Sequence, residues 1–170
     1  MDLELIKLTE KDVSNIYHIQ QAAFLPLLEK YKDYDTSPAM ETEAVILQKL
    51  CRSGTAAYGF LVGGRLAGCV RIHEGRDKSC QVSALCVLPE YQNRGIAQEA
   101  MRKLELLYPA VRCWRLDTIL QEAGNCHLYE KLGYVQTGRH VTSYKGMTLV
   151  DYEKSVILDN TQKSLDFGRK

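Results

Sequence analysis

The segment CQVSALCVLPEYQNRGIAQEAM, residues 80–101, constrains the fold of this chain more than any other stretch. Its first part is a β pattern that becomes apolar on both faces, as expected for a central strand covered by helices on both sides. Pro89 ends that pattern. From Gly95 onward the apolar side chains recur at helical spacing: Ile96, Ala97, Ala100, Met101, Leu104 and Leu107. A buried strand that passes directly into an amphipathic helix indicates an α/β protein.

The N-terminal third predicts one short strand and two helices. Leu3 and Leu5 indicate an opening strand, and Thr9 to Asp12 reads as a capping box that starts a helix. We expect Pro26 to end or kink that helix. Residues 29–40 are polar and loop-like, and Ser37-Pro38 predicts the start of a second helix, which Gly54 closes.

The rest of the chain predicts a sheet with two further helices. Residues 55–74 form a hairpin pattern around Gly63-Gly64, where two glycines supply the positive φ angles of a tight turn. Residues 111–120 read as a strand and 122–134 as a helix closed by Gly133, and β runs near 134–140 and 147–157 finish the sheet. The order predicts one mixed α/β (α+β) domain over residues 1–158, with a polar tail at 159–170.

Composition excludes several classes of function. A net charge of +1 makes neither nucleic acid nor an anionic membrane the expected partner. No apolar run reaches the ~18 residues of a membrane helix, and the acidic start is unlike a signal peptide, so we expect a cytoplasmic protein. The six cysteines include no CxxC pair, which favours buried reduced thiols and no metal site.

The loop before the second long helix pattern has the geometry of an anion site. The first turn of a helix has unpaired N–H groups and a positive dipole end. Gly95 and Ala97 let a ligand approach the backbone closely, and Arg94 adds a charged donor. These features favour a phosphate or pyrophosphate, with an ordinary strand-to-helix turn as the alternative. The loop matches neither GxxxxGK[ST] nor GxGxxG, which argues against a Walker or Rossmann site.

Two blocks in order resemble the GCN5-related N-acetyltransferase (GNAT) family. VSALCVLPEYQNRGIAQEAM resembles the family's signature strand, its Q/R-x-x-G-x-G/A loop and the following helix, and GNCHLYEKLGYVQTG resembles a later block. The resemblance covers about residues 2–157 and implies a mostly antiparallel twisted sheet of about seven strands, flanked by about four helices and splayed at its central strand. It also implies an enzyme that moves an acetyl group from acetyl-CoA to a primary amine by direct attack, without a metal.

The same resemblance assigns the cofactor site. It implies that backbone amides of the loop bind the pyrophosphate, that the central strand pairs its main chain with the pantetheine arm, and that two residues of the later helix lie near the cofactor. A solvent-pointing side chain is the alternative for Arg94, and packing is the alternative for the later pair. The residues concerned are Gln92, Asn93, Arg94, Gly95, Ile96, Ala97, Gln98, Leu85, Cys86, Val87, Asn125 and Tyr129.

Catalytic roles follow partly from chemistry and partly from the resemblance. Tyr129 is the expected acid, since a phenol near the thioester sulfur can protonate the leaving thiolate. Many relatives carry a glutamate as general base where this chain has Gln81, an amide that cannot accept the proton. Glu74 is the expected replacement, with His73 beside it, and a water chain is the third possibility.

The acceptor is expected to be a small-molecule or peptide amine. In the family, the connection between the first two helices commonly walls the acceptor site, and here it contains Tyr31, Asp33 and Tyr34, which could hold a cationic amine such as a polyamine. A solvated loop is the alternative. For the whole chain, the rival function is a non-catalytic acyl-CoA-binding sensor or regulatory module, because Gln81 removes the usual base. A homodimer formed through the late strands is open as well.

Overall fold

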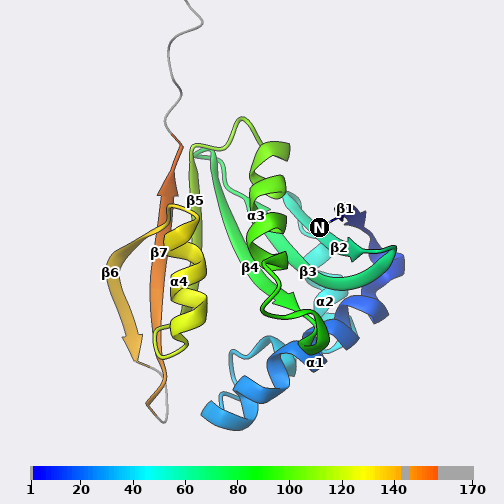
Figure 1. Cartoon of the computed structure of the whole chain (residues 1–170), viewed down its shortest axis with the longest axis horizontal. Coiled ribbons are helices and arrows are strands. Elements are labelled where there is room, and N and C mark those ends of the chain that lie inside the picture. Colours follow the sequence, from blue (N-terminus) through cyan, green and yellow to red (C-terminus); the bar gives the residue numbers. More distant parts are fainter. Residues whose placement is uncertain (1, 143–145, 157–170) are drawn as a thin grey trace, which may run out of the picture.

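The computed structural model describes residues 2–142 and 146–156, so the expected tail at 159–170 lies outside the described residues. The elements follow the predicted order (Figure 1). The strands are β1 (Leu3–Leu8), β2 (Thr55–Val62), β3 (Arg65–Glu74), β4 (Ser79–Val87), β5 (Cys113–Ile119), β6 (Val135–Thr142) and β7 (Thr148–Ser155). The α-helices are α1 (Val13–Tyr31), α2 (Glu43–Leu50), α3 (Ile96–Leu107) and α4 (Ala123–Lys131). Short 3-10 helices are η1 (Glu10–Asp12), η2 (Pro38–Met40) and η3 (Pro89–Tyr91).

The seven strands form one sheet in the order β1-β2-β3-β4-β5-β7-β6, which confirms the predicted fold class. Every neighbouring pair is antiparallel except β4 and β5. That parallel pair is also the shortest, with only Ser79 to Gln81 opposite Cys113 to Arg115. Beyond those residues the two strands diverge, as Figure 1 shows. The sheet is therefore splayed at its centre.

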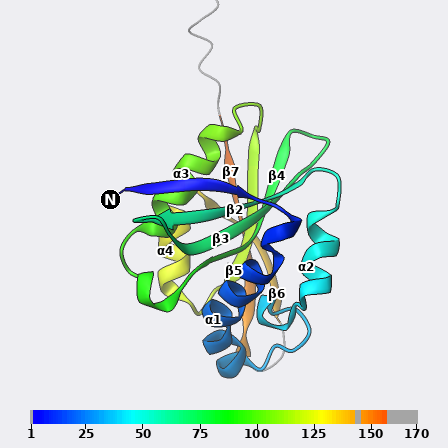
Figure 2. The ribbon, with the colours of Figure 1, turned by 90° about the vertical axis from the view of Figure 1, so that its right-hand side faces the viewer.

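Helices cover both faces of the sheet (Figure 2), as the apolar central strand predicted. Ala100, Met101 and Leu104 of α3 and Tyr129 of α4 belong to the larger buried cluster on one face. The other face holds a smaller cluster that contains residues of α1 and α2, among them Ile16 and Ile46. The divergence of β4 and β5 thus opens a passage between two separately packed helix layers.

The N-terminal helix begins as predicted but ends later. Thr9 and Asp12 exchange the reciprocal hydrogen bonds of a capping box at the start of η1, which runs into α1. Of the two outcomes expected at Pro26, an end or a kink, the end does not occur. α1 continues through Pro26 to Tyr31, and ends where Lys32 takes a left-handed φ of 56°. An interior proline forfeits one backbone hydrogen bond, which packing of an apolar helix face can offset.

The predicted start of the second helix at Ser37-Pro38 is only partly correct. Ser37 caps the 3-10 turn η2, not an α-helix. Thr42 supplies the N-cap of α2 by accepting from the N–H of Val45, and α2 ends at Leu50, before Gly54. The connection between α1 and α2 is therefore an irregular segment with one helical turn.

A β-bulge bends the central strand at the splay. Cys69 lies opposite Cys86 and Arg71 opposite Ser83. Between these pairs β4 has two residues, Ala84 and Leu85, where β3 has one. Within this bulge Ala84 has a φ of 48°, a left-handed conformation that is costly for any residue with a Cβ. Bulges bend a strand and re-aim its side chains. This bulge lies just after the point where β4 leaves β5.

Candidate active site

The loop between β4 and α3 alternates left-handed and extended or right-handed residues. Asn93 has a φ of 59° and Gly95, the N-cap of α3, a φ of 76°. The Gln92 side chain folds back and donates from Nε2 to the Val87 carbonyl at 2.9 Å, which ties the loop to the end of β4. Arg94 lies over the Tyr91 ring, with its guanidinium carbon 5.7 Å from the ring centre. The loop is thus a built backbone turn with exposed residues at its tip.

From Asn93 onward the main-chain donors of this loop have no acceptor in the described part of the protein, whereas the Gln92 N–H donates to the Pro89 carbonyl at 3.3 Å. The first hydrogen bond of α3 runs from the Glu99 N–H to the Gly95 carbonyl at 3.0 Å. No side chain caps the helix, since its N-cap is glycine. Consequently the six N–H groups from Asn93 to Gln98 donate to no residue of the described ranges. A row of unpaired amides at a helix N-terminus is suited to bind a phosphate or pyrophosphate.

The predicted strand residues lie beside the splay in different ways. Leu85 is half-buried and lines the cavity, while Cys86 and Val87 are buried. The Cys86 thiol lies 3.6 Å from that of Cys69, and this contact, together with burial, raises the pKa of the Cys86 thiol. Because β4 pairs with β5 only as far as Gln81, the following main chain has a free edge toward β5. An extended ligand could pair with that edge.

A cavity of about 300 Å³ opens where the two strands diverge. Its walls come from α1, the α1–α2 connection, the middle of β3 and β4, β5, α4 and the start of β7. The volume is at the lower end of the range for small-ligand sites. Because these walls belong to both helix layers, a ligand on the α3–α4 side and one on the α1–α2 side could meet there.

Tyr129 and Asn125 both line the cavity from α4, as their spacing of four predicted. Tyr129 is buried, its ring packs edge-on against Tyr134, and no described residue hydrogen-bonds its hydroxyl. Burial, followed by the nearby charge of Asp117, raises the pKa of Tyr129. The phenol is therefore protonated throughout the neutral range, as a proton donor must be. Asn125 is exposed at the rim.

Asp117 is a carboxylate of this cavity that the sequence reasoning missed. It lies on β5, lines the cavity, and pairs with no cation in the described ranges. Asp117 is exposed to solvent, and the protein atoms around it still weaken the hydration of its carboxylate. That desolvation, and then the carboxylate of Asp151 opposite it on β7, raise the pKa of Asp117. A carboxylate with a raised pKa beside a buried phenol can serve in acid–base chemistry.

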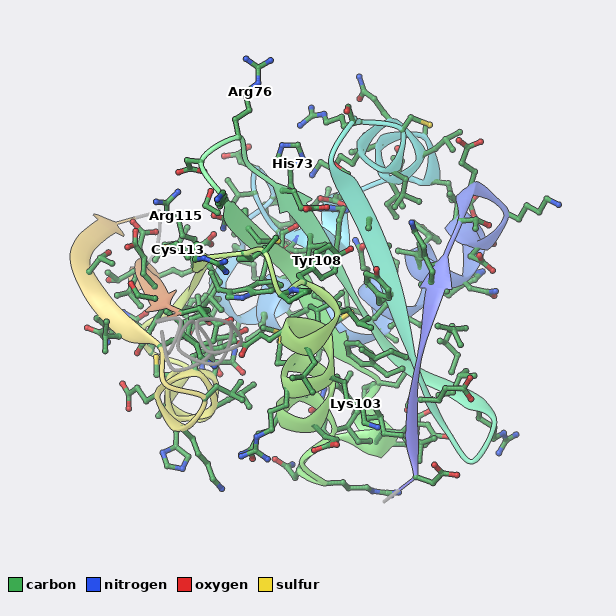
Figure 3. The ribbon with its side chains drawn as sticks, turned by 90° about the horizontal axis from the view of Figure 1, so that it is seen from above. His73, Arg76, Lys103, Tyr108, Cys113 and Arg115 are labelled. Carbon is green, nitrogen blue, oxygen red and sulfur yellow. The ribbon has the colours of Figure 1, made fainter. Side chains whose placement is uncertain are left out.

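The structure does not bring Glu74 to Tyr129. Glu74 is exposed at the end of β3 opposite Cys80, whereas the cavity is bordered by residues 82–85 of β4. His73 lies at the same end and contacts Thr55 through Nδ1 at 2.9 Å. Figure 3 looks onto this end of the sheet, with His73 near the β3–β4 turn that carries Arg76. Gln81 is still paired with β5 and does not line the cavity either.

The predicted acceptor residues have three different environments. Asp33 lines the cavity, but its carboxylate accepts from the N–H and hydroxyl of Thr36 and so closes its own turn. Tyr31 is buried, and its hydroxyl donates to Glu122 at 2.6 Å, which fixes the end of α1 to the start of α4. Tyr34 is 56% exposed and does not line the cavity. Only Asp33 of the three therefore borders the cavity.

Comparison with known proteins places the chain in a family. A family model described as the acetyltransferase (GNAT) family matches residues 14–134. The chain belongs to the GNAT acetyltransferase family. It is therefore an acyl-CoA-dependent N-acetyltransferase that uses acetyl-CoA, and nothing found favours the alternative of a non-catalytic sensor. No curated protein sequence matches the chain.

Solved structures with the same fold have low sequence identity. The ribosomal-protein-S18-alanine N-acetyltransferase of Escherichia coli is 16% identical over 95% of this chain and 98% of its own, with a TM-score of 0.73. An N-acetyltransferase of Staphylococcus aureus is 16% identical over 91% and 99%, with a TM-score of 0.72. The PaiA N-acetyltransferase of Thermoplasma acidophilum, in complex with coenzyme A, is 17% identical over 92% and 100%, with a TM-score of 0.69.

The described residues hold neither a metal site nor a helix that could span a membrane. No group of three His, Cys, Asp or Glu side chains in residues 2–142 and 146–156 is arranged to hold a metal ion. Over the same residues, none of the helices has the length and apolar content needed to cross a membrane.

Proposed function

We propose that acetyl-CoA binds along the α3–α4 side of the splay, with its pyrophosphate on the amides of residues 93–98 and its pantetheine arm along the free edge of β4. The unpaired first turn of α3 supports the first contact. The open β4 edge after Gln81 supports the second. Together they would place the thioester at the cavity, where Leu85 borders one wall and Tyr129 the other. A main-chain N–H of β4 would stabilise the oxyanion.

Asp117 is the base of this proposal, in place of Glu74. An alkylammonium with a pKa near ~10 must lose a proton before it can attack. Asp117 is the carboxylate of the cavity that has no partner in the described ranges, and its raised pKa makes it a better proton acceptor than an ordinary aspartate. The nitrogen then attacks the thioester carbonyl directly, and the carbon–sulfur bond breaks. The Tyr129 hydroxyl protonates the departing thiolate, and the proton that the nitrogen must still lose to become an amide restores the phenol.

The observation that carries this proposal is that Asp117 of β5 and Tyr129 of α4 line the same cavity, beside the point where β4 leaves β5. The acceptor would approach from the α1–α2 side, next to Asp33 and the α1–α2 connection. A cytoplasmic location is part of the proposal, supported by six cysteines that are all free thiols. A homodimer stays a prediction.

The test is a pair of tyrosine variants. Tyr129→Phe should keep the affinity for acetyl-CoA, measured by calorimetry, and lower kcat by about 10²-fold or more, because the thiolate loses its proton donor. Tyr134→Phe is the matched control, because the Tyr134 ring packs against the ring of Tyr129. The Tyr134 hydroxyl, however, donates to Glu105 outside the cavity. Equal activity of the two variants would remove Tyr129 from the mechanism. An absence of CoA release with every amine tested would overturn the proposed function.

A further inference from the structure

An ion cluster at the α1–α2 end of the cavity has no part in the steps above. It consists of Glu41, Lys49 and Arg71, which all line the cavity. Glu41 Oε1 accepts from Lys49 Nζ and from Arg71 Nη2 at 3.1 Å, and Oε2 accepts from Arg71 Nη1 at 3.0 Å and from Gln20 Nε2 at 3.2 Å. The Glu41 and Arg71 side chains are about nine-tenths buried, while that of Lys49 is 33% exposed.

The hydrogen bonds within this cluster leave N–H donors of Lys49 and Arg71 free, but use every acceptor site of the Glu41 carboxylate. A carboxylate offers about four lone-pair sites, and Glu41 uses four. Burial alone would raise the pKa of Glu41, but the bonds from Arg71 and Lys49 outweigh it and lower that pKa. Lys49 and Arg71 each keep N–H groups that donate to no other described residue. The cluster therefore has a net charge of +1 and can still bind an anion, but not an ammonium.

The two other carboxylates of the cavity differ in whether they have a hydrogen-bond partner. The Asp33 carboxylate is used within its own turn by Thr36. Asp117, on the far side of β4, has no partner in the described ranges. Arg71 lies opposite Ser83, and the β4–β5 register, if it continued past Gln81, would set Ser83 opposite Asp117. The Cα atoms of Arg71 and Asp117 are therefore about two strand spacings, ~10 Å or more, apart. The cavity thus presents a cationic end and an anionic end.

From this division we propose that the acceptor is a zwitterionic amine, with a carboxylate that binds Lys49 and Arg71 and an amino group that faces Asp117. The inference rests on the proposed function and names its substrate class. A polyamine, which the acidic α1–α2 connection suggested, would bring a second ammonium next to Lys49 and Arg71, where like charges repel. An amino acid or a similar amino carboxylate instead satisfies both ends.

The experiment compares amines that differ only in the charge of one end. L-Methionine, γ-aminobutyrate and ε-aminocaproate, each beside its own carboxamide, and spermidine are titrated by calorimetry into the protein saturated with CoA and into the protein alone. We expect at least one carboxylate to bind about tenfold more tightly than its carboxamide, which corresponds to one charge-assisted contact. Spermidine should bind more weakly than that carboxylate.

Two lysine variants then locate the effect. Lys49→Met removes one of the two cavity donors and leaves Arg71 with Glu41 alone, a pair of zero net charge, so the carboxylate preference should fall to about twofold or less. Lys154→Met is the matched control, because Lys154 also pairs with a largely buried glutamate, Glu105, at 2.5 Å but lies outside the cavity. It should keep the full preference.

The outcomes separate this inference from the proposed function. Tighter or equal binding of the carboxamides, tightest binding of spermidine, no binding of any probe, or an unchanged preference in Lys49→Met would each overturn the zwitterionic acceptor. Release of CoA in the presence of acetyl-CoA is measured separately on the same panel. Carboxylate-selective binding without any CoA release would leave the anion subsite in place and contradict the transferase mechanism instead.

Discussion

Gly95→Ala tests the proposed contact between the α3 N-terminus and the pyrophosphate of acetyl-CoA. An ideal Cβ at Gly95 meets no atom within 4 Å, so the substitution creates no clash in the protein itself. Its φ of 76° is left-handed, which costs a non-glycine residue about 1–2 kcal/mol. For a chain of this size that loss corresponds to a fall in Tm of about 2–8 °C. The added methyl group would stand where the phosphates must approach.

The expected loss of affinity follows from the hydrogen bonds displaced. A hydrogen bond to a charged phosphate contributes about 1.5–3 kcal/mol, so losing one weakens acetyl-CoA binding about ten- to a hundredfold. Gly64→Ala is the control: Gly64 has the same φ of 76°, equally free space around its Cβ, and lies in the β2–β3 turn. Calorimetry and thermal unfolding should show similar stability losses in both variants and an affinity loss in Gly95→Ala alone. Equal affinities of the two variants for acetyl-CoA would exclude the α3 N-terminus as the pyrophosphate site.

The remaining predictions concern two carboxylates beside the cavity. Asp151→Asn removes a charge that raises the pKa of Asp117, so the acidic limb of the kcat/KM profile should move to lower pH; a limb that stays in place would exclude Asp117 as its source. Glu41→Gln should cost about 3 kcal/mol at neutral pH by urea unfolding, because Arg71 and Lys49 lose their anion. Since the folded-state pKa of Glu41 is lowered, its contribution is present above the ordinary glutamate pKa and is lost as pH falls, so the wild-type advantage should shrink in acid; a constant gap would contradict this.

The order of elements was predictable because local patterns specify it. Period-two and helical spacing, the capping box at Thr9 and the glycine turn at Gly63-Gly64 all act over a few residues, and the structure agrees with each. That the helix continues through Pro26 could not be predicted, since the penalty of an interior proline is local, while the packing that retains the helix comes from residues distant in sequence. Ser37 was a correct cap, but of a single 3-10 turn.

The loop between β4 and α3 was predictable for the same reason, and the position of Asp117 was not. The unpaired amides follow from a glycine at a helix start, which the sequence displays directly. Nothing in the sequence marks Ala84 as left-handed, and the bulge there shifts which strand positions face the cavity. Asp117 reads as one polar residue in a half-buried strand, and only the splay of β4 from β5 and the approach of α4 bring it to Tyr129. Glu74 was close in sequence to the expected place, but it lies opposite Cys80 and does not line the cavity.

Asp117→Asn is the decisive variant, because proton acceptance from the amine is proposed to depend on this one carboxylate. The measurement is the steady-state release of CoA from acetyl-CoA with a reactive amine, over a range of pH, together with calorimetric binding of acetyl-CoA. We predict unchanged acetyl-CoA affinity, a loss of about 10²-fold or more in kcat/KM at neutral pH, and partial recovery at alkaline pH, where the free amine supplies itself. Wild-type activity of Asp117→Asn at neutral pH would contradict the account.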